Sequence, residues 1–187
     1  KTRLAQSIGS AAACAAYERL LSQVLVTLAS LPRLEIRHAP DDAAPEFERW
    51  LRPGWTTRPQ GDGDLGARLI RAFDESFAHG IGPAVVVGTD CPDVAIEDLQ
   101  AAAVALETGS ADVVLGPARD GGYWLVALKA AHPTLFQGID WSTERVLRQT
   151  LDAASRANLR VRLLAVKEDI DTEAEWQSYM RRSGGAS

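Results

Sequence analysis

The chain has 187 residues, of which 46% are hydrophobic and 24% are charged, a composition typical of a soluble globular protein with one core. The formal net charge of −5 argues against binding to nucleic acid or to an anionic membrane, because both need a basic surface. Two distant cysteines, Cys14 and Cys91, provide neither a disulfide framework nor a zinc site, which favours a reduced, cytoplasmic protein. We expect one domain over residues 1–182 and a disordered tail over 183–187.

The first third of the chain predicts a long helix, a strand and a short helix. Residues 11–31 carry apolar side chains at helical spacing, but their middle is too polar to span a bilayer. Pro32 ends this helix, and residues 34–38 alternate apolar and polar side chains, as a strand covered on one face does. Residues 44–51 predict a short helix, and residues 55–60 are extended.

A glycine-rich, acidic loop then leads into the central part of the chain. Residues 65–78 predict a helix with one apolar stripe. The run Ala-Val-Val-Val at 84–87 is typical of a central parallel strand that is buried on both faces. Residues 96–106 predict the next helix, with acidic residues in its first turn.

The last third adds strands on either side of a polar turn. The apolar segments 111–117 and 123–128 predict an antiparallel pair or a sharp change of direction. Residues 142–158 predict a helix that is capped by its first serine, residues 160–166 the last strand and residues 173–182 a closing helix. Strands alternate with helices, which indicates an α/β protein whose mainly parallel sheet carries an antiparallel element.

Acidic residues directly follow several of the predicted strands. Asp90 lies in Gly-Thr-Asp-Cys-Pro, Asp120 in Arg-Asp-Gly-Gly-Tyr, and Asp169 and Asp171 follow the last strand. In open α/β sheets, ligands bind beyond the carboxyl ends of the strands. Carboxylates gathered at that edge would repel one another unless a divalent cation lay between them.

Six motifs carry a resemblance to a known family. They are Lys-Thr-Arg-Leu at 1–4, Gln-Gly-Asp-Gly-Asp-Leu-Gly-Ala-Arg at 60–68, Gly-Thr-Asp-Cys-Pro at 88–92, Gly-Pro-Ala-Arg-Asp-Gly-Gly-Tyr at 116–123, Trp-Ser-Thr at 141–143 and Asp-Ile-Asp-Thr at 169–172. Through these motifs the chain resembles the small bacterial glycosyltransferase-like proteins called radical-SAM/selenodomain-associated transferases. The resemblance implies a three-layer, Rossmann-like glycosyltransferase-A fold, which is the nucleotide-diphospho-sugar transferase fold. That family begins with a strand and a Pro-Gly loop ahead of its Lys-Thr-Arg, so we expect the sequence to begin after the first strand.

The resemblance also implies roles for the matching residues. Lys1 and Arg3 would hold phosphate, and Asp90 would bind Mg²⁺ or Mn²⁺ with Asp171 as a second ligand.

The resemblance places four further residues, Asp120, Gly121, Gly122 and Tyr123, along the acceptor or sugar pocket. Asp120 would orient a hydroxyl or act as a base, and the glycines would let the backbone come close to the ligand. Cys91 is not expected to act as a nucleophile, because its acidic neighbour disfavours a thiolate.

Two segments leave binding and structural roles open. Gln60 and Arg68 can meet a base or a phosphate, but Arg68 can equally be a solvated helix residue, and Asp64 can bind ligand or cap its helix. Trp141 is interpreted as a hydrophobic staple ahead of Ser142, and the helix start is an alternative anion site.

These features together predict a metal-dependent transferase that uses a nucleotide-activated substrate. Glycosyl transfer from a nucleoside-diphosphate sugar is the leading prediction. The alternatives are a nucleotidyltransferase acting on a nucleoside triphosphate and a phosphorylated acceptor, and a non-catalytic nucleotide-binding module. The expected partners are a nucleotide or nucleotide-sugar and a small acceptor, without nucleic acid or a transmembrane segment.

Overall fold

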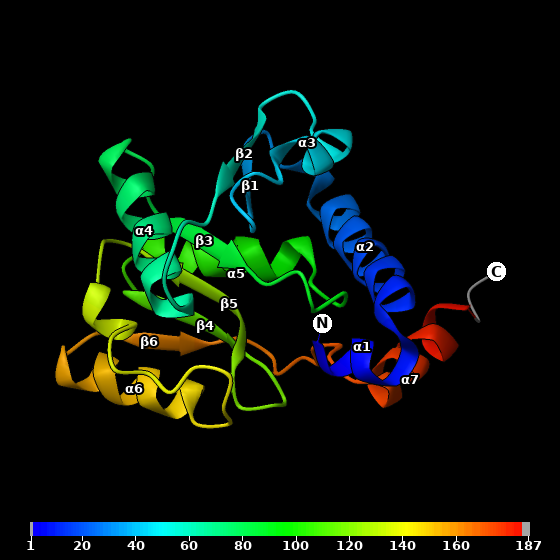
Figure 1. Cartoon of the computed structure of the whole chain (residues 1–187). Helices are drawn as coiled ribbons and strands as arrows, with labels where there is room; N and C mark the ends of the chain where they lie inside the picture. The colour runs from blue at the N-terminus through cyan, green and yellow to red at the C-terminus, as the bar shows by residue number, and fades with distance from the viewer. Residues whose placement is uncertain (1, 185–187) are drawn as a thin grey trace.

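The computed structural model describes residues 2–184, which form a two-stranded sheet, a four-stranded sheet and the surrounding helices (Figure 1). The strands are β1 (Leu34–His38), β2 (Trp55–Pro59), β3 (Ala84–Val87), β4 (Val113–Pro117), β5 (Tyr123–Leu128) and β6 (Val161–Leu163). The α-helices are α1 (Thr2–Ile8), α2 (Ser10–Thr27), α3 (Ala44–Phe47), α4 (Leu65–Ala78), α5 (Ile96–Glu107), α6 (Val146–Arg156) and α7 (Glu173–Gly184). Short 3-10 turns are η1 (Leu28–Ser30), η2 (Glu48–Trp50) and η3 (Pro133–Leu135).

The larger sheet has the strand order β3-β5-β4-β6. Strand β5 runs antiparallel to both of its neighbours, whereas β4 and β6 are parallel, so β3, β4 and β6 point in one direction. Strands β1 and β2 pair in parallel as a separate sheet. The predicted antiparallel element, formed by the segments on either side of the polar turn, is therefore confirmed.

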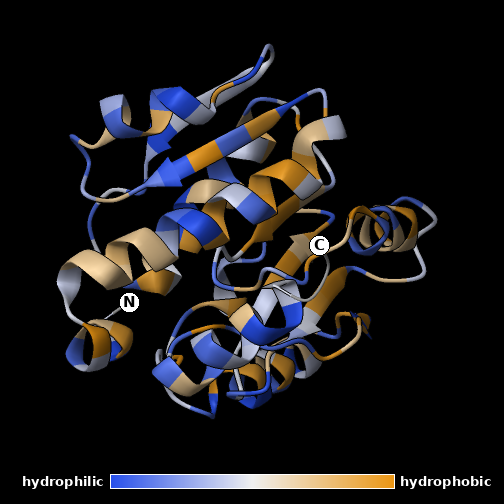
Figure 2. Cartoon of the chain, turned by 90° about the vertical axis from the view of Figure 1, so that its right-hand side faces the viewer, coloured by the Kyte–Doolittle hydropathy of each residue, from blue (hydrophilic) through white to orange (hydrophobic). Residues whose placement is uncertain are grey.

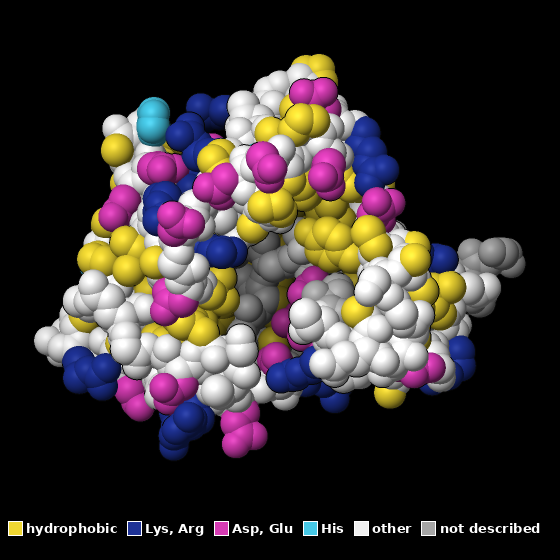
Figure 3. Space-filling model, in the orientation of Figure 1, with side chains coloured by type: hydrophobic (Ala, Val, Ile, Leu, Met, Phe, Trp, Pro, Cys, Tyr) yellow, Lys and Arg dark blue, Asp and Glu magenta, His cyan; other side chains and the backbone are white. Residues whose placement is uncertain are grey.

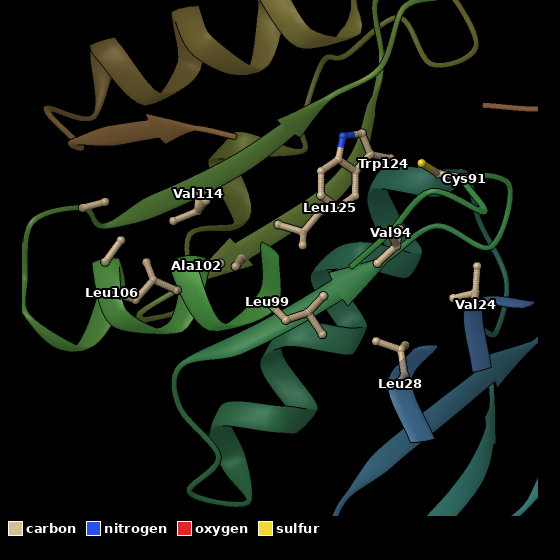
Figure 4. Packing of buried hydrophobic residues seen from close by; sticks show 13 residues of the cluster. Val24, Leu28, Cys91, Val94, Leu99, Ala102, Leu106, Val114, Trp124 and Leu125 are labelled. Carbon is tan, nitrogen blue, oxygen red and sulfur yellow. The ribbon is translucent and has the colours of Figure 1, made fainter. Parts of the chain in front are cut away.

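The four-stranded sheet separates two hydrophobic cores. Side chains alternate along β5, so that Leu125 and Ala127 face the core formed with α2 and α5, whereas Val126 and Leu128 face the core formed with α4 and α6. Figure 4 shows the first core, in which side chains from α2 and α5 meet those of the sheet. In Figure 2 the inner strands are mainly hydrophobic, whereas the helices also carry hydrophilic residues. This helix–sheet–helix layering confirms the predicted three-layer α/β class.

Strand β3 departs from its prediction in one respect. Val85 and Val87 contact one core and Val86 contacts the other, as expected for a strand covered on both faces. Within the described residues, however, β3 stands at the end of the strand order and its neighbour is antiparallel, so the three valines are only half-buried. Among the described strands, β3 therefore does not have the predicted central position with parallel neighbours, because pairing partners are decided by distant segments.

Three boundaries in the last third also differ from the prediction. Helix α6 begins at Val146, and Ser142 has a left-handed backbone (φ 63°) where the sequence predicts a helix cap. Strand β6 covers three residues only, although the chain continues beside β4 through a hydrogen bond from Lys167 N to Pro117 O (3.0 Å). Helix α7 extends to Gly184, so the predicted tail begins too early, and its last three residues lie outside the described range.

The N-terminal helices form a small cluster of their own. Gly9 (φ 85°) separates α1 from α2, and Leu4 packs against Ala13 and Ala16 in a cluster that Trp176 of α7 also contacts. No helix within residues 2–184 is long and apolar enough to cross a membrane.

Candidate functional site

The loop after β3 is held from two sides. Gly88 N donates to Trp124 O of β5 (2.8 Å), and Asp90 O accepts a hydrogen bond from Ile170 N (2.9 Å). Asp90 and the Asp169-Ile170-Asp171 segment, which are far apart in the sequence, therefore lie together beyond the carboxyl ends of β3 and β6. This is the edge of the sheet at which ligands bind in open α/β folds.

The acidic segment is fixed on its other side by helix α7. Asp171 N and Thr172 N both donate to Glu175 Oε2 (2.7 Å each), and Glu175 N donates to Thr172 Oγ1 (3.4 Å). This reciprocal capping at the start of α7 satisfies helix N–H groups that would otherwise lack partners. The backbone that carries Asp171 is therefore held in place before any ligand is present.

Cys91 follows Asp90 in the loop after β3, and its thiol is buried in the core. Burial raises its pKa to about 12, and the negative charge of Asp169 acts in the same direction. A neutral, fully buried thiol is a packing group, which agrees with the prediction that Cys91 is not a nucleophile.

Lys167 is a structural residue of this edge that the sequence analysis missed. Its Nζ donates to Asp93 O (2.7 Å), forms an ion pair with Asp98 and lies 4.6 Å from the ring centroid of Trp124. Asp98 Oδ2 also accepts from Ala95 N (2.9 Å) at the start of α5. Lys167 thus links the segment after β6 to α5, and its charge is already used by the fold. The only sequence signal for this role of Lys167 is its place between the last strand and the acidic segment.

The glycine turn between β4 and β5 is compact. Ala118 N donates to Gly122 O (3.0 Å), and Asp120 Oδ1 accepts from Gly122 N (2.9 Å). Gly121 has φ 90°, and a Cβ there would lie 2.6 Å from Glu144 Cα, so the fold itself requires this glycine. Asp120 is exposed, so its carboxylate remains accessible although one oxygen closes the turn.

The structure does not present the Tyr123 hydroxyl to a ligand. Burial raises the pKa of this phenol, and its oxygen is buried without a hydrogen-bond partner among the described residues. The ring packs edge-on against Trp141, with 6.4 Å between the ring centroids. The hydroxyl is therefore enclosed by the core that α6 shares with the sheet, and the predicted place of Tyr123 along a pocket stays a prediction. Trp141 is a packing residue, as the staple interpretation expected, although the next helix begins only at Val146 and not at Ser142.

The loop before α4 uses its polar residues internally. Gln60 Nε2 donates to Arg37 O (3.0 Å), and Arg68 donates to Gln60 Oε1 (2.8 Å) and to Gly63 O (3.1 Å). Asp64 Oδ1 accepts from Ala67 N (2.9 Å) and so caps α4. For Asp64 and Arg68 these contacts favour the structural reading, and their predicted contacts with a nucleotide stay predictions.

The two predicted phosphate-binding cations are at the start of the chain. Arg3 is exposed on α1, and Lys1 lies outside the described residues. In Figure 3 a hollow opens in the middle of the face seen in Figure 1, between the part that carries α4 and the part that carries α1 and α2, and acidic side chains line one of its walls.

Within the described residues, the acidic side chains at this edge do not form a complete set of metal ligands by themselves. Among residues 2–184, no group of three or more His, Cys, Asp or Glu side chains is placed to hold a metal ion. Asp90 and Asp171 nevertheless lie on loops that are joined by a hydrogen bond. Mg²⁺ is commonly held by one or two carboxylates with substrate phosphates and water as its other ligands, and this pair suits that arrangement.

The three layers, the antiparallel strand within the sheet and the acidic loops at its carboxyl edge define a protein with a nucleotide-diphospho-sugar transferase fold. A candidate nucleotide-diphospho-sugar transferase from Desulfovibrio desulfuricans G20 has a TM-score of 0.89 and 32% sequence identity to this chain. That match covers 100% of this chain and 82% of the other.

Two further solved structures share the fold at low sequence identity. Molybdopterin-guanine dinucleotide biosynthesis protein A from Archaeoglobus fulgidus has a TM-score of 0.59 and 13% identity, and the match covers 89% of this chain and 86% of that one. Rv0371c from Mycobacterium tuberculosis H37Rv has a TM-score of 0.52 and 15% identity, with 87% of this chain and 84% of that one covered. These two show the fold alone.

The chain belongs to the bacterial family described as "Uncharacterized protein conserved in bacteria (DUF2064)", whose model matches residues 23–143. No curated protein matches the sequence. The superfamily implied by the six sequence motifs is thereby confirmed.

Proposed function

We propose that this protein is a metal-dependent transferase that acts on a nucleotide-activated substrate, with glycosyl transfer from a nucleoside-diphosphate sugar as its reaction. The observation that carries the proposal is the joining of the Asp90 loop to the Asp171 segment at the carboxyl edge of the sheet. Similarity over the whole chain to a candidate nucleotide-diphospho-sugar transferase supports it.

Asp90 and Asp171 are the residues that would hold Mg²⁺ or Mn²⁺. When bound, the cation supplies positive charge that offsets the negative charge of the substrate diphosphate. The protein contributes rigidity. Hydrogen bonds from Gly88 N to Trp124 O and from Ile170 N to Asp90 O fix the Asp90 loop, and Glu175 fixes the Asp171 segment. Loops that are fixed before binding need no reorganisation during the reaction.

Two exposed side chains complete the proposed site. Asp120 would orient or deprotonate the acceptor hydroxyl from the β4–β5 turn, and the cationic Arg3 would hold phosphate from α1.

A binding screen by thermal shift tests the function. Nucleoside-diphosphate sugars and nucleoside triphosphates are added with Mg²⁺, with Mn²⁺ or with a chelator. A ligand at about a hundred times its dissociation constant should stabilise the protein by roughly 2.7 kcal/mol. We expect one diphosphate sugar to do so, and the chelator to abolish the effect.

Asp90→Asn tests the metal assignment, with Asp152→Asn on the exposed side of α6 as the matched control. We expect the first variant to lose metal-dependent binding with an unchanged circular dichroism spectrum, and the control to bind as the wild type does. Equal binding by both variants would contradict the role of Asp90. Stabilisation by a triphosphate with release of pyrophosphate would favour nucleotidyl transfer, and no binding of any nucleotide would contradict the proposed function.

A further inference from the structure

Most glycines near the proposed site are explained by the chain itself. A Cβ on Gly66 would lie 2.8 Å from Trp141 Nε1, and one on Gly116 would lie 2.6 Å from Trp124 Cζ2. These positions exclude any larger residue for packing reasons alone.

Gly88 is different, because nothing in the described part of the chain requires a glycine there. It is not among the residues with a positive φ. An added Cβ would lie 3.6 Å from Trp124 O and 4.0 Å from Trp124 Cα, which are ordinary contact distances. The hydrogen bond from its N–H to Trp124 O would be kept by alanine. Glycine is nevertheless the less stable choice at the end of a strand, because it loses more backbone freedom on folding.

The position of Gly88 suggests what its missing side chain is for. Gly88 directly follows β3, is exposed and lies two residues before Asp90. It therefore presents bare backbone at the edge where the two acidic segments meet. A glycine that the fold does not need, at an exposed strand end beside a binding edge, is expected where a ligand approaches the backbone closely.

We infer that Gly88 is a positioning residue, whose bare backbone contacts the nucleotide part of the substrate. This inference rests on the proposed function. The argument is steric: a methyl group at residue 88 makes only ordinary contacts with the Trp124 backbone in the folded chain, and it would occupy volume that the bound nucleotide needs. Gly88→Ala should therefore preserve folding and weaken binding, and Gly88→Val should weaken binding further.

The test measures melting temperature and nucleotide affinity on the same proteins. The probes are UDP, GDP, CDP, ADP and dTDP with Mg²⁺, titrated calorimetrically into the wild type and the variants. Gly184→Ala is the control, because this glycine lies at the end of α7, without a positive φ and without any described atom within 4 Å of an added Cβ. We expect Gly88→Ala to melt within about 2 °C of the wild type and to lose about tenfold or more in affinity. Gly184→Ala should change neither quantity.

Each other outcome overturns the inference in a distinguishable way. Equal affinity of wild type and Gly88→Ala would refute the role of Gly88 and leave the proposed function standing. A large drop in the melting temperature of Gly88→Ala would show that the fold requires this glycine. Failure of the wild type to bind any probe would refute the proposed function and the inference together.

Discussion

The Trp124 ring leaves no room for a side chain at residue 116, so Gly116→Ala should lower the free energy of unfolding. Gly116 is buried in β4, and Trp124, on the neighbouring strand β5, is 1% exposed. A Cβ at residue 116 would lie 2.6 Å from Cζ2 of the indole, 2.9 Å from Cδ2 and closer still to Cε2. The ring cannot easily move away, because its Nε1 donates to Ala165 O (3.3 Å) and Lys167 covers its face.

Gly116→Ala is therefore expected to destabilise the protein. Overpacking a tight core costs about 1–3 kcal/mol, and the lower entropy of the unfolded alanine chain offsets roughly 0.4–1 kcal/mol of that cost. The net loss should be about 1–2 kcal/mol, a sizeable part of the roughly 5–15 kcal/mol that stabilises a typical domain. Urea unfolding followed by far-UV circular dichroism measures this loss without depending on Trp124 fluorescence.

A double-mutant cycle identifies the indole as the cause. Trp124→Phe removes the atoms nearest the added methyl group, so Gly116→Ala should cost less in that background than in the wild type. If Gly116→Ala were as stable as the wild type, or cost the same in both backgrounds, the steric reasoning would be refuted.

Two other predictions concern ionisable groups. Asp112 accepts hydrogen bonds from Arg160 Nε (2.9 Å), Nη2 (2.8 Å) and backbone N (3.0 Å), and these hydrogen bonds hold its pKa well below the usual value. A carboxylate with a lowered folded pKa stabilises the protein above its unfolded pKa and loses that contribution as pH falls, so Asp112→Asn should cost about 1 kcal/mol at pH 7 and less at pH 3. An equal cost at both pH values in urea titrations would contradict this assignment. The buried Cys91, with its pKa raised to about 12, should react with a thiol reagent at pH 8 only after unfolding, whereas the exposed Cys14 should react at once. Rapid reaction of both thiols in the folded protein would argue against the burial of Cys91.

The accuracy of the sequence predictions depended on how local the determining contacts are. Helix α4 has its predicted bounds, because its apolar stripe and its cap at Asp64 depend only on residues within and next to the helix. The predicted start of α6 at Ser142 was wrong. The backbone around Ser142 is set by the packing of Trp141 against Gly66, which is distant in the sequence. The end position of β3 was missed for the same reason, since an apolar run does not specify its pairing partner.

The candidate site shows the same division. The acidic loops were predicted from their position after strands, and the hydrogen bond between Asp90 and Ile170 brings them together. The sequence did not show which side chains the fold would use for itself. The Tyr123 hydroxyl is enclosed by the core that α6 shares with the sheet, and Lys167 finds its carboxylate partner in α5, both through contacts between distant segments.

The position of Lys167 has a consequence for the spacing of the two proposed metal-binding carboxylates. Lys167 lies four residues before Asp171 and is anchored to the first turn of α5, whereas Asp90 lies in the loop that leads into that same helix. Asp90 and Asp171 therefore both lie on segments that are attached to the start of α5, although neither residue belongs to this helix. The hydrogen bond from Ile170 N to Asp90 O and the ion pair of Lys167 with Asp98 therefore attach the acidic segment both to the loop that carries Asp90 and to the helix that follows this loop.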